Sequence, residues 1–185
     1  VTNNIISDIA TKSLSGGHGI MRQQGDFSNF GTDDDPDKYR WDINGNLIFN
    51  VEQRIYSWVP SKGFINLTLD EGKPILIDET TDRELRARIT ENVVAYGAID
   101  AIRIKPTTNL EVSHNSVYAD GEHADGITDT NTLSDTAPFD TDPFPGLSLI
   151  SNLVWTANGT NAYEINDGVL SQNTSFSGNV YYGGD

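Results

Sequence analysis

The chain contains no cysteine among its 185 residues, which excludes disulfide bonds and thiolate metal sites. Its three histidines, His18, His114 and His123, lack the close spacing of zinc ligands on one element, so a histidine zinc site is not expected. No apolar run approaches the roughly 20 residues that a membrane-spanning helix needs. Membrane insertion is therefore not expected.

Basic residues are scarce beside acidic ones. The chain has 12 Lys and Arg residues against 27 Asp and Glu residues, which gives a formal net charge of −15. A surface of this sign repels nucleic acid phosphates and anionic membranes, so nucleic acid binding is not expected. Two interpretations of the charge stay open: a solvated acidic surface, or an excess of carboxylates that includes specific calcium sites.

What the sequence does contain is a pattern, Φ-x-x-Asn-x-Φ, in which Φ is an apolar or aromatic residue. It recurs at Asn4, Asn46, Asn92, Asn115, Asn152 and Asn179. The shortest interval, from Asn92 to Asn115, is close to one plain turn of a parallel β-helix, and the longer intervals require insertions. The repeat predicts an all-β, right-handed parallel β-helix of about five to six turns.

The asparagines have a physical reason to recur. One turn cannot bury its apolar side alone, whereas stacked turns bury a continuous core. A corner between strands leaves backbone N–H and C=O groups pointing inward, and a buried Asn amide can satisfy both kinds of group. It can also pair with the Asn above and below. The sequence therefore predicts an asparagine ladder, whose members are structural rather than functional.

Each turn is expected to hold two further strands. The second strand follows the asparagine, and its expected copies are 19–20, 74–77, 101–104, 125–127 and 162–165. The third strand precedes the next asparagine, as in 109–112 and 168–170. The alternative fold is an antiparallel sandwich, which gives no reason for an asparagine at the same place six times.

Three insertions are expected in a single domain that spans 1–185, at about 23–41, 50–72 and 129–146. Long loops on a rigid scaffold commonly carry binding residues. The first two insertions hold Trp41, Tyr56 and Trp58, beside carboxylates and arginines, as is typical of a sugar-binding cleft. The alternative is that these rings close the loops onto the β-helix.

A column of aromatic residues is expected three positions after the asparagines. It contains Phe49, Tyr118, Trp155 and Tyr182. If the strands stack in register, alternation points these side chains outward at the ~4.8 Å spacing of neighbouring strands. Such a ladder could stack on sugar rings. The alternative is that the stacked rings only stabilise the sheet.

Aligning the expected second strands suggests a catalytic constellation. Asp100 and Asp125 fall in one column with His18, Arg103 falls in a neighbouring column, and His123 lies just before Asp125. Such groups could abstract the C5 proton of a uronic acid while an arginine or a cation neutralises the sugar carboxylate. The alternative is that an Asp before Gly at a corner is a turn residue.

Calcium is the cofactor that the acidic residues suggest. Two oxygen-rich groups are candidate ligands: Asp33, Asp35 and Asp37 in the first insertion, and Asp120, Glu122 and Asp129 beside the expected second strand of a later turn. The alternative for both groups is solvated charge.

The stretch Ile89–Ile104 resembles the generic repeat of the right-handed β-helix superfamily that includes pectate lyases, alginate lyases and mannuronan C5-epimerases. The resemblance implies the fold over most of the chain outside the insertions. The epimerases' Asp-Pro-His motif is not matched, because the chain has Asp35-Pro36-Asp37 and Asp142-Pro143-Phe144 instead. No catalytic residues are therefore carried over from the family.

The final residues, Tyr181–Asp185, resemble the entry into the Gly-Gly-x-Gly-x-Asp calcium repeats of secreted repeats-in-toxin proteins. This resemblance implies a secreted, calcium-linked bacterial protein. The repeat pattern already includes Val1 and extends to the C-terminal residues, so we expect the chain to be part of something longer.

Two functions follow as expectations. The first is a secreted domain that binds or processes an extracellular acidic polysaccharide or cell-surface glycan, with calcium assisting; as an enzyme it would be a polysaccharide lyase or a uronate epimerase. The second is a non-enzymatic structural or adhesive module of a cell-surface or filament-forming protein. The open strand edges of a β-helix would then pair end to end.

Overall fold

The structure of the protein is a computed structural model. It describes residues 1–9, 17–23, 41–51, 57–59, 63–65, 72–78, 87–97, 100–104, 110–119, 125–129, 147–156, 162–165 and 174–183. Every regular element in this described part is a β-strand. The helix-free composition agrees with the all-β fold that the sequence predicts.

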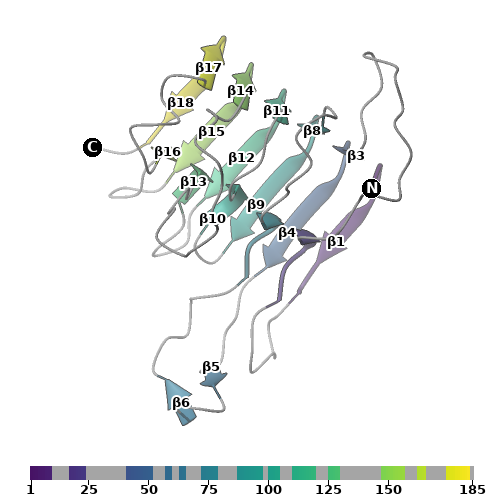
Figure 1. The fold of residues 1–185 in the computed structure, drawn as a ribbon, viewed down its shortest axis with the longest axis vertical. Helices are drawn as coiled ribbons and strands as arrows, with labels where there is room; N and C mark the ends of the chain where they lie inside the picture. The colour runs from purple at the N-terminus through teal and green to yellow at the C-terminus, as the bar shows by residue number, and fades with distance from the viewer. Residues whose placement is uncertain are drawn as a thin grey trace, which may run out of the picture.

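Three parallel sheets form the body of the structure (Figure 1). Sheet I contains β1 (Ile5–Ser7), β4 (Leu47–Val51), β9 (Val93–Gly97), β12 (Ser116–Ala119), β15 (Leu153–Thr156) and β18 (Val180–Tyr182). Sheet II contains β2 (Ile20–Gln23), β7 (Ile75–Asp78), β10 (Asp100–Ile104), β13 (Asp125–Asp129) and β16 (Tyr163–Ile165). Sheet III contains β3 (Trp41–Asn44), β8 (Ala87–Thr90), β11 (Leu110–Ser113), β14 (Leu147–Ile150) and β17 (Thr174–Ser177).

The chain visits the three sheets in a fixed order: sheet I, then sheet II, then sheet III. Each round, which we call a coil, adds one strand to each sheet beside the strand from the previous coil. All of these pairs are parallel, as coiling in one direction requires. The arrangement is compatible with a parallel β-helix. A separate antiparallel hairpin, β5 (Ser57–Val59) and β6 (Gly63–Ile65), lies within the second expected insertion, away from the stacked sheets (Figure 1).

The expected second strands are confirmed. They correspond to β2, β7, β10, β13 and β16, all in sheet II. The third strand expected at 109–112 is β11, within one residue. The third strand expected at 168–170 lies outside the described residues, and the described sheet III strand of that coil is β17.

The asparagine ladder is confirmed and has a direction. From Asn46 onward, each ladder side-chain oxygen accepts hydrogen bonds from the backbone N–H and the Nδ2 of the ladder asparagine one coil earlier. Asn92, for example, donates to Asn115 Oδ1 at 3.0 Å from its backbone and 2.9 Å from its amide. The second amide hydrogen of Asn92 goes back to the carbonyl of Ile43, at 2.9 Å. The Asn92 side chain thereby satisfies two backbone groups at the corner of the preceding coil, the Ile43 C=O and the Asn46 N–H.

The residue before each ladder asparagine turns the corner with a positive φ. Gly45 and Gly178 do so at φ 65° each. The other four corners use residues with side chains: Asn3 (φ 56°), Glu91 (φ 57°), His114 (φ 55°) and Ser151 (φ 53°). The left-handed conformation costs a non-glycine residue about 1–2 kcal/mol. The ladder therefore imposes a corner geometry that four of these six residues adopt under strain.

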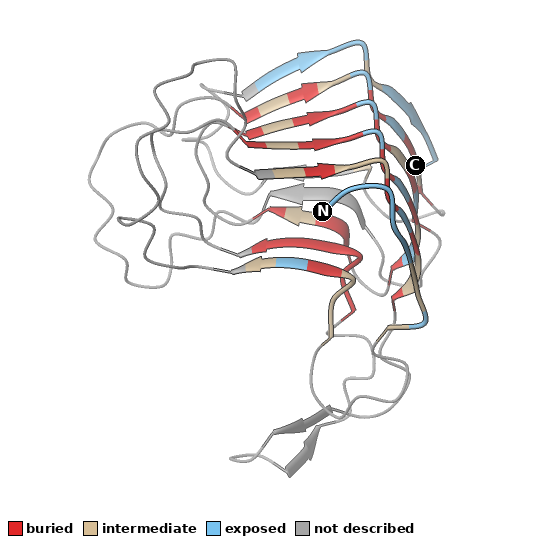
Figure 2. Ribbon diagram, turned by 90° about the vertical axis from the view of Figure 1, so that its right-hand side faces the viewer, coloured by how far each residue is buried: buried red, intermediate tan, exposed pale blue. Residues whose placement is uncertain are grey.

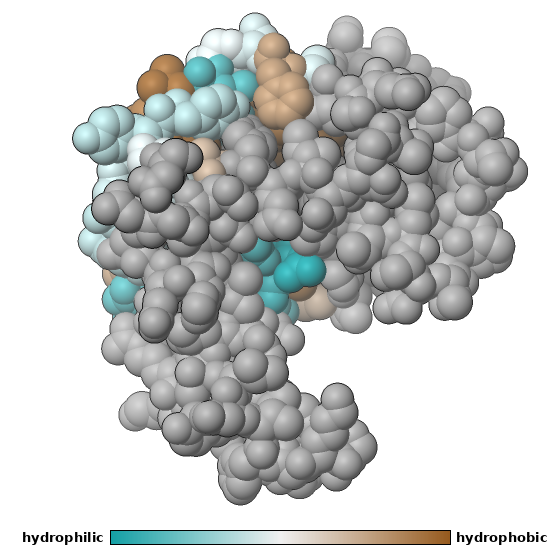
Figure 3. Space-filling view, turned by 90° about the vertical axis from the view of Figure 1, so that its left-hand side faces the viewer, coloured by the Kyte–Doolittle hydropathy of each residue, from teal (hydrophilic) through white to brown (hydrophobic). Residues whose placement is uncertain are grey.

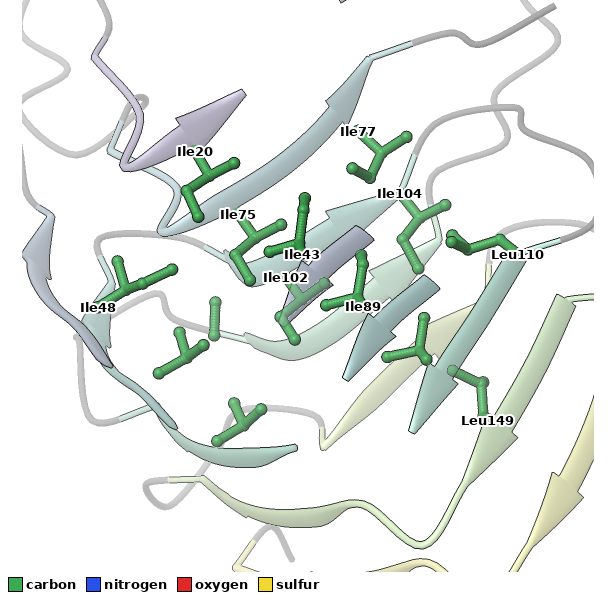
Figure 4. Packing of buried hydrophobic residues seen from close by; sticks show 14 of the residues in the cluster. Ile20, Ile43, Ile48, Ile75, Ile77, Ile89, Ile102, Ile104, Leu110 and Leu149 are labelled. Atoms are coloured by element: carbon green, nitrogen blue, oxygen red, sulfur yellow. The ribbon is translucent and has the colours of Figure 1, made fainter. Parts of the chain in front are cut away.

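The core lies between the three sheets. Its residues alternate along each strand with outward-facing ones, as the period of 2 requires. β-Branched side chains dominate it: Ile75 and Ile102 from sheet II, and Ile89 from sheet III, are all fully buried (Figure 4). Burial is concentrated in the inner coils, while residues of both end coils are exposed (Figure 2).

Replacing an inner ladder asparagine should destabilise the fold. Asn115→Leu leaves the Asn92 N–H, one Asn92 Nδ2 hydrogen and the Ile89 carbonyl without their buried partner. Buried polar groups left unpaired cost about 1–3 kcal/mol each, so we expect a loss of about 3 kcal/mol or more. Urea unfolding followed by circular dichroism measures it. The control is Asn4→Leu, at the exposed end of the ladder, and equal losses in the two variants would contradict the account.

Relieving corner strain should stabilise the fold. His114 is exposed and adopts φ 55°. His114→Gly therefore removes the energetic cost of the left-handed conformation, although it also raises the conformational entropy of the unfolded chain. The net gain should be about 0.5–1 kcal/mol in the free energy of unfolding. Ser116→Gly, two residues later in β12, is the matched control and should destabilise. A lower stability for His114→Gly would show that the corner is not strained.

Candidate functional site

Sheet I presents two outward columns of side chains. The first column lies one position after each ladder asparagine: Ile5, Leu47, Val93, Ser116, Leu153 and Val180. The second lies three positions after: Ser7, Phe49, Ala95, Tyr118, Trp155 and Tyr182. We call these twelve residues the apolar face. The register confirms that these residues form one column, in which Tyr118, Trp155 and Tyr182 occupy three successive strands.

The apolar face carries no charged residue, and serines are its only polar members. Leu153 is 51% exposed and Tyr182 is 70% exposed, whereas Val154, on the inward side of the same strand as Leu153, is fully buried. Large contiguous apolar surfaces are rare on monomeric soluble proteins and commonly mark interaction sites. The apolar face is therefore the strongest candidate binding surface in the described part of the chain.

Two rings of the apolar face stack on each other. The rings of Tyr118 and Trp155 lie with centroids 4.2 Å apart and an interplanar angle of 5°. Tyr96 meets the same Tyr118 edge to face, at 5.4 Å and 67°. Aromatic pairs in these geometries add about 0.5–1.5 kcal/mol beyond the area they bury. The three rings form one cluster across β9, β12 and β15, which we call the aromatic cluster.

The place of Tyr96 in the aromatic cluster depends on a backbone bend. Four positions after the ladder asparagine, simple alternation would turn a side chain inward, as Ala119 and Thr156 do, with 0% and 1% exposure. Tyr96 instead adopts φ 57° and is 41% exposed. The same position adopts a positive φ in three other coils, at Asp8 (φ 57°), Asn50 (φ 55°) and Gly183 (φ 95°), so the bend is a repeated feature of sheet I. Tyr96 was not among the residues predicted from the sequence. The available signal was a tyrosine at a position where the other coils have smaller residues.

Sheet III, by contrast, has a polar outer face. Arg88 Nη2 lies 2.8 Å from Asp42 Oδ2 in the neighbouring strand, with both side chains about one-third exposed. Ser175 Oγ donates to Ser148 Oγ at 3.0 Å farther along the same column. Polar residues on this sheet and apolar residues on sheet I show that the two outer surfaces are chemically distinct.

The predicted alignment of sheet II is confirmed in its described register. Asp100 pairs with Asp125, and Arg103 pairs with Thr128 on one side and Leu76 on the other. Arg103 Nη1 lies 3.2 Å from Asp100 Oδ2, and the Asp100 side chain is only 4% exposed. The Asp100 carboxylate is bound by Arg103 and shielded from water. It could contact a polymeric ligand only if this ion pair broke. The geometry therefore favours a structural role for the Asp100–Arg103 pair.

A buried lysine lies in the same column. Lys73 precedes Ile75 by two residues, as His18 precedes Ile20 and Asp100 precedes Ile102, and these isoleucines pair in register. The backbone N–H of Lys73 donates to His18 Nδ1 at 3.4 Å, and Lys73 is only 5% exposed. Buried lysines are rare and are commonly paired. Sequence reasoning missed Lys73, because a lysine beside Gly72 and Pro74 looks like a loop residue.

Several predicted site residues are not tested. His123, Tyr56, Asp33, Asp35, Asp37, Asp120 and Glu122 lie outside the described residues. For Trp41, Trp58, Asp125 and Asp129 the backbone alone is described, in β3, β5 and β13. Their roles in binding, catalysis or calcium coordination stay predictions.

Metal ligands do not cluster in the described part of the chain, where no group of three or more His, Asp or Glu residues could hold an ion. The same residues contain no helix that is long and apolar enough to cross a membrane. A comparison with family models, curated proteins and solved structures finds no match for the chain. The case for a function therefore rests on the geometry of the three sheets.

Breaking the pair in sheet II should destabilise the protein. Arg103→Met leaves the buried Asp100 carboxylate without the guanidinium, and we expect a loss of about 2 kcal/mol, since one partner remains a quarter exposed. Adding Asp100→Asn should restore part of the loss, because a neutral amide is cheaper to bury. Urea unfolding of both single variants and the double variant measures the coupling. Additive losses would show that the pair is not coupled.

Proposed function

We propose that the chain is a right-handed parallel β-helix domain that binds an extended polysaccharide along the apolar face of sheet I. The observation that carries the proposal is the stacked Tyr118–Trp155 pair, which faces outward on a regular sheet. The handedness rests on a general rule, since connections between parallel strands are right-handed in about 98% of cases. The resemblance of Ile89–Ile104 to the repeat of β-helix polysaccharide enzymes supports the same proposal.

The shape of the apolar face favours a polymer over a small molecule. Small ligands bind in concave pockets that bury most of their surface, whereas this face is the open side of a sheet. Its outward positions recur at the ~4.8 Å spacing of parallel strands, so each coil offers one equivalent contact. A chain of sugar rings, each with an apolar face of C–H groups, can meet such a row ring by ring.

Charge narrows the ligand further. A net charge of −15 disfavours nucleic acids, whose bases could otherwise stack on the same rings. An acidic polysaccharide shares the protein's sign, and its carboxylates need a cation between them and the protein. Calcium held by the predicted Asp and Glu groups fills that role in the proposal. A ligand of this kind is extracellular, which is why we propose that the domain is secreted.

Binding rather than processing is the function we favour. Among the predicted catalytic residues, the structure describes the side chains of Asp100 and Arg103. These two side chains form an ion pair with each other in sheet II, whereas the aromatic cluster lies in sheet I. A general base has to reach the proton that it abstracts. The aromatic cluster can contact a ligand without the breaking of an ion pair.

Removing the outward tryptophan should weaken glycan binding. With alginate and pectate as ligands, each with and without calcium, and a neutral glucan for comparison, Trp155→Ala should lower the affinity about tenfold or more, since one stacking surface is lost. Isothermal titration calorimetry measures the affinity. Leu153→Ala, at an outward position of the same strand without an aromatic ring, is the comparison variant and should lower the affinity less than Trp155→Ala does.

Two results would contradict the proposal. One is a wild-type protein that binds none of these polymers. The other is a Trp155→Ala variant that binds as tightly as wild type. Unsaturated sugar products, detected by their ultraviolet absorbance during the same incubations, would instead show that the domain processes its ligand.

A further inference from the structure

The apolar face has two columns of different chemistry. The column that holds the stacked pair of Tyr118 and Trp155 is the aromatic column. The other lies two residues earlier on each strand, about 6.6 Å away along the strand, and we call it the aliphatic column. On the strands of sheet I that are paired on both sides, its members are Leu47, Val93, Ser116 and Leu153.

The aliphatic column is open to solvent within the stack. Leu47 is 37% exposed, Val93 is 46% exposed and Leu153 is 51% exposed. Their strands, β4, β9 and β15, each have a neighbouring strand on both sides. A row of sugar rings on the aromatic column would therefore lie with one edge beside these three side chains.

An unsubstituted sugar edge is a poor match for the aliphatic column. Its hydroxyl groups would lose water against Val93 and Leu153, and a hydroxyl that is desolvated without a hydrogen-bond partner opposes binding. An apolar substituent at the same edge would gain from the contact instead. The aliphatic column therefore favours a polymer whose sugar hydroxyls are substituted on that edge.

One polar group interrupts the aliphatic column. Ser116 on β12 pairs in register with Val93 on one side and with Leu153 on the other. Its side chain is partly exposed and is shorter than either neighbour. A serine hydroxyl can donate a hydrogen bond to a carbonyl oxygen. The three residues thus offer one donor between two apolar side chains.

The spacing of these three residues suits a small group. Val93 and Leu153 lie on the two strands that flank β12, so their backbones are ~9.6 Å apart. Carbon atoms pack at about 3.5–4.0 Å from each other. A single methyl group above Ser116 can therefore contact both apolar side chains.

Charge points to a neutral substituent. None of the residues of the apolar face is charged, although the chain carries a net charge of −15. Seen from the left-hand side of Figure 1, the described surface mixes hydrophilic and hydrophobic side chains (Figure 3). A carboxylate placed against the aliphatic column would be desolvated without a partner, whereas an ester group carries no charge.

We propose that the aliphatic column binds an acetyl group on the polysaccharide, with Ser116 donating to the ester carbonyl while Val93 and Leu153 contact the methyl. The inference rests on the proposed function and narrows its ligand to an acetylated acidic polysaccharide. An acetyl ester joins a carbonyl acceptor and a methyl group to a sugar hydroxyl through a short link. It leaves the sugar carboxylates ionised, as calcium binding in the proposed function requires.

The experiment compares one polymer with and without its acetyl groups. Acetylated alginate, and the same sample after mild alkaline deacetylation, are titrated into the 185-residue chain in the presence of calcium. Isothermal titration calorimetry should show about tenfold tighter binding of the acetylated polymer. Trp155→Ala should weaken the binding of both polymers by a similar factor and so preserve the ratio.

Two variants should reduce the preference for acetyl groups. Ser116→Ala removes the donor to the ester carbonyl, and Leu153→Ala removes one apolar contact of the methyl. Each should lower the ratio of the two affinities about threefold or more, with little change for the deacetylated polymer. Leu47→Ala, in the same column but not beside Ser116, is the matched control and should leave the ratio unchanged. Circular dichroism establishes that each variant is folded.

Two results would overturn the inference: equal affinity of the wild-type protein for the two polymers, or a preference that survives in both Ser116→Ala and Leu153→Ala. If the affinities are equal and both fall in Trp155→Ala, the acetyl site fails while the proposed function stands. If neither polymer binds, the proposed function fails and the acetyl site fails with it.

Discussion

The fold depends on one interaction, the hydrogen bonding of buried asparagine amides between successive coils. Each inner amide satisfies a backbone N–H and a backbone C=O at the corner of the preceding coil, at distances of 2.9–3.0 Å for Asn92 and Asn115. An apolar residue at these corners would leave inward-pointing backbone groups unpaired in a dry interior. The ladder thereby fixes the register of sheet I, and that register fixes which side chains face outward.

The corner strain and the apolar face are consequences of this register. The residues before the ladder asparagines adopt a positive φ because the corner must place the amide inward. The strand that follows then alternates from a fixed starting point, so Tyr118 and Trp155 meet as stacked neighbours. Tyr96 joins them through a second bend that interrupts the alternation. Inward-facing structural residues and the outward-facing rings therefore lie next to each other in sequence and on opposite sides of the sheet.

Much of the fold could be predicted from the sequence, because the repeat carries the register. The asparagine spacing predicts the strands of sheet I, the inward isoleucines and the outward aromatic column. Tyr96 could not be placed, since alternation does not foresee a bend. Lys73 could not be found either, because its burial depends on neighbours that are distant in sequence. The pairing of Asp100 with Arg103 was also hidden: the column alignment brought them near each other, but it could not show that they bind each other rather than a ligand.

The central claim is that the aromatic cluster on sheet I contacts an extended polysaccharide. The most direct measurement is the nuclear magnetic resonance spectrum of the three tryptophan indole N–H groups during titration with an oligouronate and calcium. The account predicts that the resonance of Trp155 shifts together with the ring resonances of Tyr96 and Tyr118. A titration in which those signals stay fixed, while other residues respond or nothing does, would contradict it.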